Sequence, residues 1–189
     1  MLIKVGLKNI KIGTLKYLTQ AGGKLEKNKL REIINFCKRN NIKFFSMYGQ
    51  TEASPRISYL KPEFSEKKIG SIGKGLSGNK IYIIDNNGKK ILKPYVEGEI
   101  INEGKNVFMG YSKNCNDLNK LNEKNYKLKT GDLGFFDKDG FFFITSRISR
   151  IAKIFGNRVD LGDLESLMSQ KNYKVVCLSD NNKISIFIE

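Results

Sequence analysis

IKFFSMYGQTE, residues 42–52, decides the fold of this chain. Its apolar start predicts a strand over residues 42–46, and its polar end predicts a loop. The preceding residues predict an amphipathic helix over 26–39, because apolar side chains recur there at the spacing of one helical face: Leu30, Ile33, Ile34 and Cys37. Residues 14–25 add a strand and a glycine turn. A helix between two strands is typical of a mainly parallel α/β sheet, in which ligands bind at the carboxyl ends of the strands.

The pattern of the sequence changes twice more along the chain. Between residues 69 and 145, short strands such as 80–84 and 98–102 alternate with turns, which predicts a small β-barrel or sandwich. After residue 150, a strand, a helix capped by Asp160 and two more strands predict a small α+β unit. The predicted fold class is therefore α/β plus β-barrel plus the start of a small α+β domain.

The composition excludes several kinds of chemistry. The chain has no histidine, which removes His-based triads and His-ligated zinc sites. Its three cysteines, Cys37, Cys115 and Cys177, are far apart, which favours a reducing cytoplasm and gives no metal-ligand spacing. No apolar run approaches the roughly 18 residues needed to span a bilayer. We therefore expect a cytoplasmic protein without a membrane span.

The formal net charge of +15 has three possible origins. The excess is mostly lysine, scattered among abundant Asn, Ile and Phe, which is typical of surface positions that drift in an AT-rich genome. The alternatives are a site for an anionic small molecule and a basic module that binds nucleic acid. Because nucleic-acid readers cluster arginine with exposed aromatic side chains, we do not expect nucleic acid as the partner.

The polar loop at residues 48–52 carries groups that suit a nucleotide. The Tyr48 ring offers a stacking face for a purine, and Gly49 permits close approach of the backbone. The Thr51 hydroxyl can bond a phosphate oxygen, and the Glu52 carboxylate can hold Mg²⁺ beside it. The alternative is an ordinary exit from a strand with a capping threonine, and the loop alone does not decide between them.

Three other glycine-containing stretches are candidates for nucleotide binding, and they are not equally well supported. Asp132 follows Gly131 on a predicted turn, where its carboxylate can accept two hydrogen bonds from a vicinal diol such as ribose, although a plain turn aspartate is the alternative. Gly22-Gly23-Lys24 permits close backbone approach. Residues 73–78 match G-x-G-x-x-G, but a strand follows them instead of a helix. We therefore reject a dinucleotide site there.

Three stretches in a fixed order resemble the nucleotide-binding signatures of the adenylate-forming ligases: Tyr48-Gly49-Gln50-Thr51-Glu52, Thr130-Gly131-Asp132, and Ser146-Arg147 through Lys153 to Gly156-Asn157-Arg158. This family comprises acyl-CoA synthetases, luciferases and peptide-synthetase adenylation domains. The resemblance implies a partial ligase fold with four parts: the end of the large α/β domain (1–68), its β-barrel subdomain (69–145), a hinge (146–150) and a truncated small α+β domain (151–189).

The resemblance implies ATP or AMP and Mg²⁺ as cofactors and assigns roles by position. Glu52 would hold the metal, and catalytic roles fall to Thr51, Lys153 and Arg158. The hinge position is Ser149, where the family usually carries Asp or Lys. The nucleotide-binding residues that the resemblance implies are Gly22, Gly23, Lys24, Tyr48, Gly49, Thr51, Asp132 and Arg147.

The implied reaction joins a carboxylic acid to a thiol through an acyl-adenylate, the thiol belonging to CoA or to a carrier-protein pantetheine. The sequence contains no Ser/Thr/Gly-rich phosphate loop, and the family's last catalytic lysine would lie beyond Glu189. We therefore expect a fragment that is inactive alone, or half of a split enzyme that needs a complementary chain. The alternatives are a basic anion- or nucleic-acid-binding module without catalysis and a stranded fragment with no activity.

Overall fold

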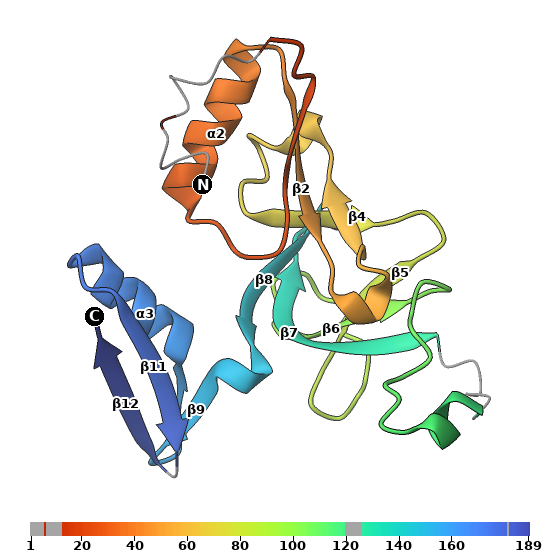
Figure 1. Ribbon diagram of the computed structural model, residues 1–189, viewed down its shortest axis with the longest axis vertical. Helices are drawn as coiled ribbons and strands as arrows, with labels where there is room; N and C mark the ends of the chain where they lie inside the picture. Colours follow the sequence, from red (N-terminus) through yellow and green to blue (C-terminus); the bar gives the residue numbers. More distant parts are fainter. Residues whose placement is uncertain (1–5, 7–12, 120–125, 181) are drawn as a thin grey trace.

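The computed structural model describes residues 6, 13–119, 126–180 and 182–189, so the start of the predicted 1–68 domain lies largely outside the described residues. Figure 1 shows a large N-terminal unit and a small C-terminal unit joined by one connection. The large unit contains, in chain order (η marks a 3-10 helix), β1 (Tyr17–Gln20), α2 (Lys27–Arg39), β2 (Lys43–Tyr48), η2 (Thr51–Ala53), β3 (Ser58–Leu60), η3 (Pro62–Phe64), β4 (Ser71–Gly75), β5 (Lys80–Ile84), β6 (Gly98–Glu103), η4 (Cys115–Asn119), β7 (Lys127–Phe136) and β8 (Phe142–Arg147). The small unit contains η5 (Ile148–Arg150), β9 (Ile151–Ile154), β10 (Asn157–Asp160), α3 (Leu161–Gln170), β11 (Val175–Asp180) and β12 (Lys183–Ile188).

Helix α2 and the parallel pair β1–β2 form the α/β part that the sequence predicts. The apolar face of α2 packs on Phe44 of β2, and its buried residues are Leu30, Ile33, Ile34, Phe36 and Cys37. Glu26 at the N-cap makes no side-chain capping bond, so packing of this face is the main support of the helix. Strand β2 runs two residues further than predicted, which places Tyr48 in the strand and begins the loop at Gly49.

The eight strands of the large unit form one hydrogen-bonded series in the order β1-β2-β3-β4-β8-β7-β6-β5. Only β1 and β2 pair in parallel among the described strands, and the rest of the series is antiparallel. Ile72 of β4 and Ile81 of β5 pack in one cluster with Ile100 of β6, so the antiparallel part curls around its own core. Residues 73–78 run from the end of β4 through a turn, and the next element is strand β5 and not a helix, as the sequence analysis expects.

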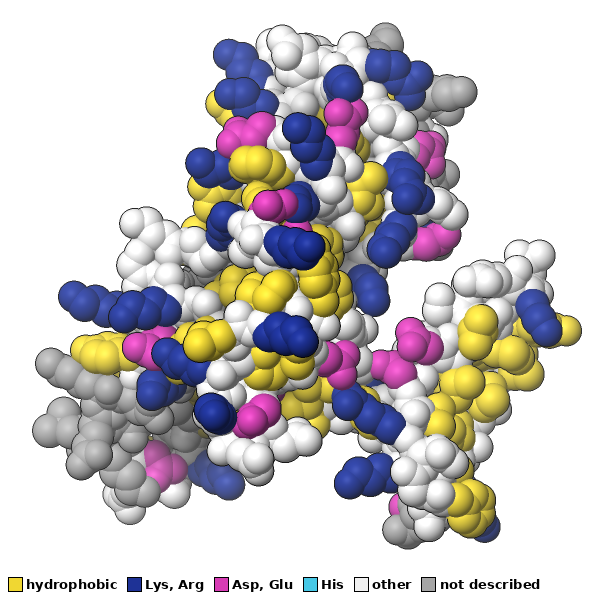
Figure 2. All heavy atoms as spheres, turned by 180° about the vertical axis from the view of Figure 1, so that it is seen from behind, with side chains coloured by type: hydrophobic (Ala, Val, Ile, Leu, Met, Phe, Trp, Pro, Cys, Tyr) yellow, Lys and Arg dark blue, Asp and Glu magenta, His cyan; other side chains and the backbone are white. Residues whose placement is uncertain are grey.

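The small unit has the α+β content that the sequence predicts. Asp160 caps α3, because its Oδ1 accepts hydrogen bonds from the backbone N–H groups of Gly162 at 2.7 Å and Asp163 at 3.2 Å. Leu161, at the start of α3, packs in a small core with Ala152 and Cys177. The hairpin β11–β12 leaves apolar side chains exposed, and Figure 2 shows apolar side chains along this unit.

The composition raised the questions of a basic binding surface and of a membrane span, and the structure bears on both. Figure 2 shows Lys and Arg side chains scattered over the visible face and interspersed with Asp and Glu, without one continuous basic patch on that face. Within the part of the chain that the structure describes, no helix has both the length and the apolar composition needed to cross a membrane.

A charge network around the buried Asp137 joins the segment after η3 to the β7–β8 turn. The Asp137 carboxylate accepts hydrogen bonds from the backbone N–H groups of Asp139 and Phe141, both at 2.9 Å, and pairs with Lys68 Nζ at 2.7 Å. Burial would raise the pKa of Asp137, but the bonds from Lys68 and from the two backbone groups outweigh it, so the pKa lies below its ordinary value.

Asp137→Asn is expected to lower the free energy of unfolding by about 2 kcal/mol at pH 7, because the ion pair with Lys68 is lost and the two bonds from backbone N–H groups lose their charge assistance. Because the folded-state pKa is depressed, the contribution of Asp137 is present above its unfolded pKa and is lost as the pH falls through the folded one. Urea unfolding at pH 7 and at pH 3 measures both effects. An equal difference between variant and wild type at the two pH values would contradict this assignment.

Candidate functional site

Asp132 lies at the centre of the site, bound to side chains from two other strands. Tyr48, at the end of β2, donates its hydroxyl hydrogen bond to Asp132 Oδ2 at 2.6 Å. Arg147, at the end of β8, is the cross-strand neighbour of Asp132, and its Nε lies 3.6 Å from Asp132 Oδ1. The structure thus brings together three residues that the sequence predicts as nucleotide-binding and that lie up to 99 positions apart (147 − 48).

The position of Asp132 corrects one sequence-based expectation. Asp132 lies inside β7 and not on a turn, because Gly131, with a φ of +73°, makes an irregularity within the strand instead of ending it. The backbone around it is fixed by the Thr130 hydroxyl, which donates to the Ile100 carbonyl at 2.8 Å and accepts from the Asp132 N–H at 3.1 Å. Glu99 Oε1 accepts from the Gly131 N–H at 3.2 Å.

Tyr48 is more buried than a stacking platform would be. Its side chain is 9% exposed and packs with Ala53 and Ile57. Burial, reinforced by the neighbouring Asp132 carboxylate, raises the pKa of the Tyr48 phenol, so the hydroxyl stays protonated and acts as a donor. The contact that the structure describes is therefore with Asp132, and stacking on a purine stays a prediction.

Glu52 lies in η2, one residue after the exposed Thr51, and has a partner that the sequence analysis missed. The Tyr111 hydroxyl donates to Glu52 Oε1, and the Phe108 N–H donates to the Glu52 carbonyl at 2.9 Å. The bond from Tyr111 lowers the pKa of the Glu52 carboxyl, which therefore stays ionised at neutral pH. The only local signal at Tyr111 is the Gly110-Tyr111 pair, and such a pair does not by itself indicate a site.

The donor set at Glu52 fits Mg²⁺ held together with a nucleotide. Within the described residues, no group of three or more His, Cys, Asp or Glu side chains is placed to hold a metal ion. Mg²⁺ commonly takes one or two carboxylates and completes its shell with phosphate oxygens and water. Glu52 can supply such a carboxylate, because its side chain is ionised and half-buried in the turn that follows β2.

The packing of the loop after β2 leaves no room for a side chain at Gly49. A Cβ at this position would lie 1.8 Å from the Pro55 carbonyl oxygen and 2.9 Å from the Arg56 Cα. The loop closes on its own backbone at this point, and η2 begins two residues later. The predicted approach of Gly49 to a nucleotide stays a prediction.

The loop at Gly22-Gly23-Lys24 lies next to strand β8. Lys24 Nζ lies 3.5 Å from the Thr145 carbonyl oxygen, and Gln20 donates a side-chain bond to the Gly23 carbonyl. Thr145 is two residues before Arg147, so this loop approaches the strand that carries Arg147. A contact of these glycines with adenine stays a prediction.

Lys153 and Arg158 lie opposite each other on the β9–β10 hairpin of the small unit. Both side chains are exposed, and Arg158 Nη2 pairs with Glu97 Oε1 of the large unit at 3.3 Å. Neither has a contact with Tyr48, Asp132 or Arg147 among the interactions of the described residues. Their predicted catalytic roles are therefore not tested by this arrangement.

Arg150, directly after the exposed Ser149, is fixed to the small unit. Its guanidinium pairs with Glu165 of α3 at 2.7 Å and donates to the Cys177 carbonyl of β11 at 3.2 Å. Glu165 also accepts from the Cys177 N–H at 2.8 Å. These bonds join the end of η5 to both α3 and β11.

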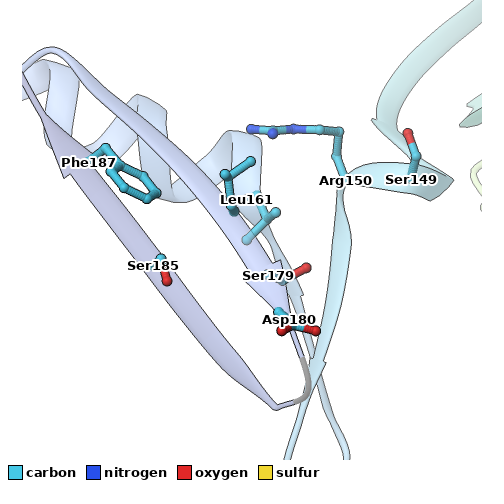
Figure 3. Close-up of a pocket in the computed structure, with 8 residues that line it drawn as sticks. Ser149, Arg150, Leu161, Ser179, Asp180, Ser185 and Phe187 are labelled. Atoms are coloured by element: carbon cyan, nitrogen blue, oxygen red, sulfur yellow. The ribbon is translucent and has the colours of Figure 1, made fainter.

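A pocket of about 410 Å³ lies in the small unit (Figure 3), and Tyr48, Asp132 and Arg147 are not among the residues that line it. Figure 3 shows the side chain of Arg150, the last residue of η5, extending toward the helix α3. The described residues that line the pocket are Ser149, Arg150, Leu161, Leu178, Ser179, Asp180, Ser185 and Phe187. None of them is one of the predicted nucleotide-binding, catalytic or metal-binding residues. We therefore place the candidate site at Asp132 and not in this pocket.

The fold and the site define a class of protein. A strand-exit loop with an ionised glutamate, beside a carboxylate held by tyrosine and arginine, is an arrangement suited to a nucleotide and a divalent cation. The family model of the AMP-binding enzymes matches residues 2–112, more than half of the chain. This chain belongs to the AMP-binding enzyme family, as the sequence resemblance predicts.

Similar proteins support the same family. The chain is 35% identical over 156 residues to a 2-succinylbenzoate–CoA ligase of Bacillus licheniformis, and the match covers 82% of this chain and 31% of the relative. A structure of O-succinylbenzoate coenzyme A synthetase from Bacillus subtilis, in complex with ATP and magnesium ion, matches 99% of this chain and 39% of that chain with a TM-score of 0.74 and 28% identity. The chain thus spans about a third of the length of the relatives that it matches.

A more distant structure extends the likeness in fold alone. An NRPS protein containing adenylation and PCP domains matches 94% of this chain and 38% of that chain with a TM-score of 0.61 and 21% identity. The predicted fold class, a partial adenylate-forming-ligase fold, is therefore confirmed.

Proposed function

We propose that this chain binds an adenine nucleotide together with Mg²⁺ and forms part of the adenylation site of an acid–thiol ligase. The observation that carries the proposal is the Asp132 carboxylate, which Tyr48 holds from one side while Arg147 lies beside it on the neighbouring strand. A carboxylate fixed in this way can accept hydrogen bonds from both hydroxyls of a ribose. Relatives whose structures contain ATP or AMP support adenosine as the nucleoside.

The other predicted residues take roles around this ribose site. Glu52 would hold Mg²⁺, whose charge would offset the negative charge of the phosphates, and the Thr51 hydroxyl would bond a phosphate oxygen. Gly22-Gly23-Lys24 would lie against the base. Lys153 and Arg158 would supply catalytic cations after the small unit turns, which requires release of Arg158 from Glu97.

The substrates proposed are a carboxylic acid and a thiol. Relatives named as 2-succinylbenzoate–CoA ligases support CoA as the acceptor, and a carrier-protein pantetheine is the second candidate. The sequence contains no phosphate loop of the kind that the family carries, so for these 189 residues by themselves we propose nucleotide binding without turnover. Its three free cysteines, Cys37, Cys115 and Cys177, are consistent with the reducing cytoplasm that we propose as its location.

Isothermal titration calorimetry of the purified chain with AMP, and with ATP in the presence and absence of Mg²⁺, tests the proposal. We expect AMP to bind without metal, because Asp132 contacts the ribose, and ATP to bind more tightly when Mg²⁺ is present. The absence of heat and of any change in melting temperature at millimolar ligand would overturn nucleotide binding. Release of pyrophosphate by the chain alone would instead contradict binding without turnover.

A further inference from the structure

Strand β7 carries more residues than its neighbour β6 at the point where Asp132 lies. Between two regular pairs of the ladder, residues 130–132 of β7 face the single residue Ile100 of β6. A bulge of this kind takes backbone groups out of the ladder and changes the direction of a side chain. Gly131 provides the left-handed backbone within it, with a φ of +73°. The direction of the Asp132 carboxylate therefore depends on what holds this bulge.

Two side chains supply hydrogen bonds inside the bulge. The buried Thr130 hydroxyl donates to the Ile100 carbonyl at 2.8 Å and accepts from the Asp132 N–H at 3.1 Å. The Glu99 carboxylate of β6 accepts from the Gly131 N–H at 3.2 Å. Because an unpaired backbone group in a protein interior is unfavourable, these bonds favour one conformation of the bulge.

We propose that Thr130 and Glu99 are positioning residues of the ribose site, which hold the bulge so that Asp132 can serve both Tyr48 and a ribose. The inference rests on the proposed function, because it takes Asp132 as the ribose ligand. The Asp132 side chain is only 15% exposed and accepts the Tyr48 hydroxyl at 2.6 Å, so little of the carboxylate faces outward and its direction matters. Loss of a positioning residue should therefore weaken recognition of the ribose hydroxyls and leave contacts with base and phosphate unchanged.

Titrations with AMP and with 2′,3′-dideoxy-AMP, followed by NMR so that weak binding is measured, test the proposal. The dideoxy nucleotide keeps the base and the phosphate but lacks both ribose hydroxyls. Thr130→Val keeps the shape of the side chain without its hydroxyl. We expect this variant to bind AMP about tenfold more weakly than the wild type does and the dideoxy nucleotide equally well. Thr130→Ser restores the hydroxyl and is expected to bind AMP within about twofold of the wild type.

A pair of Glu99 variants gives the same test at a half-buried position, and so keeps the proposal testable if Thr130→Val does not fold. Glu99→Ala removes the acceptor of the Gly131 N–H, whereas Glu99→Gln keeps an oxygen acceptor with the same change in net charge. We expect AMP to bind about threefold more weakly to Glu99→Ala and normally to Glu99→Gln. A loss shared equally by the two nucleotides, or the absence of a loss, overturns the positioning role of the residue tested while the proposed function stands.

A double-mutant cycle tests the positioning of Asp132 without a nucleotide. Urea unfolding of Tyr48→Phe, Asp132→Ala and the double variant measures the coupling between these two side chains. We expect the coupling to fall to about half or less when the cycle is made in the Glu99→Ala chain, because the carboxylate can then turn away from the Tyr48 hydroxyl. An unchanged coupling overturns the positioning role. If AMP does not bind to the wild type, the proposed function is wrong, and the cycle still decides whether the bulge positions Asp132.

Discussion

Replacing Asp132 by alanine is expected to weaken AMP binding about a hundredfold while leaving the fold intact. The carboxylate would make two charge-assisted hydrogen bonds to the ribose, worth together about 3 kcal/mol, which corresponds to about two powers of ten in affinity. Strand β7 keeps its ladder bonds to β6 and β8 in the variant, because these use backbone groups and not the Asp132 side chain. Calorimetry with AMP measures the affinity, and circular dichroism confirms the fold.

Two further variants distinguish direct contact of Asp132 with the ribose from the positioning of Asp132 by its neighbours and from a change in net charge. Tyr48→Phe removes the hydroxyl that holds Asp132 Oδ2 but keeps the buried ring, and we expect a smaller loss, about fivefold. Glu32→Gln removes a carboxylate on the exposed side of α2 and should leave AMP affinity unchanged, which controls for the change in net charge. An Asp132→Ala chain that binds AMP as the wild type does would remove the central observation behind the proposed function.

Gly49→Ala is expected to lower the free energy of unfolding by about 3 kcal/mol and the melting temperature by about 10 °C. The added Cβ would lie 1.8 Å from the Pro55 carbonyl oxygen, far inside van der Waals contact. The neighbour is backbone and not a flexible side chain, so the loop between β2 and β3 must shift as a whole. Thermal unfolding followed by circular dichroism measures the loss.

Gly23→Ala is the control for this substitution. Gly23 also lies in a loop of the predicted site, but a Cβ added there would have no atom within 4 Å, and its φ is not left-handed. We expect its melting temperature to stay within about 2 °C of the wild type, since substitutions without a clash usually change stability by less than about 0.5 kcal/mol. An equal fall in melting temperature in the two variants would show that the loop at Gly49 accommodates the added Cβ without the expected clash.

The sequence predicts those parts of the fold whose determinants are local. The helix α2 and strand β5 follow from apolar spacing and turn residues, and Asp160 was predicted as a cap because the capping bonds reach only two or three residues ahead. The limits of β2 and the placement of Asp132 inside β7 were not predicted. Both depend on pairing with strands distant in the sequence, which periodicity within one segment does not report.

The candidate site was likewise predictable only in part. Its chemical groups, Tyr48, Glu52, Asp132 and Arg147, could be chosen from motif and residue type. Their partners could not, because Tyr111 lies 59 positions from Glu52 and a hydrogen bond of that kind leaves no pattern in the sequence. The same holds for Glu97, which pairs with Arg158 across the two units.

The bonds of Arg150 to Glu165 and Cys177 bear on the hinge that the sequence predicts at residues 146–150. They join the last residue of η5 to α3 and β11, so we expect the chain from Arg150 onward to move together with the small unit. Arg147 is in turn held in the β8 ladder opposite Asp132. We therefore expect the predicted hinge to lie at Ile148 and Ser149, where a small rotation would move Lys153 and Arg158 over a much larger distance once Arg158 has separated from Glu97.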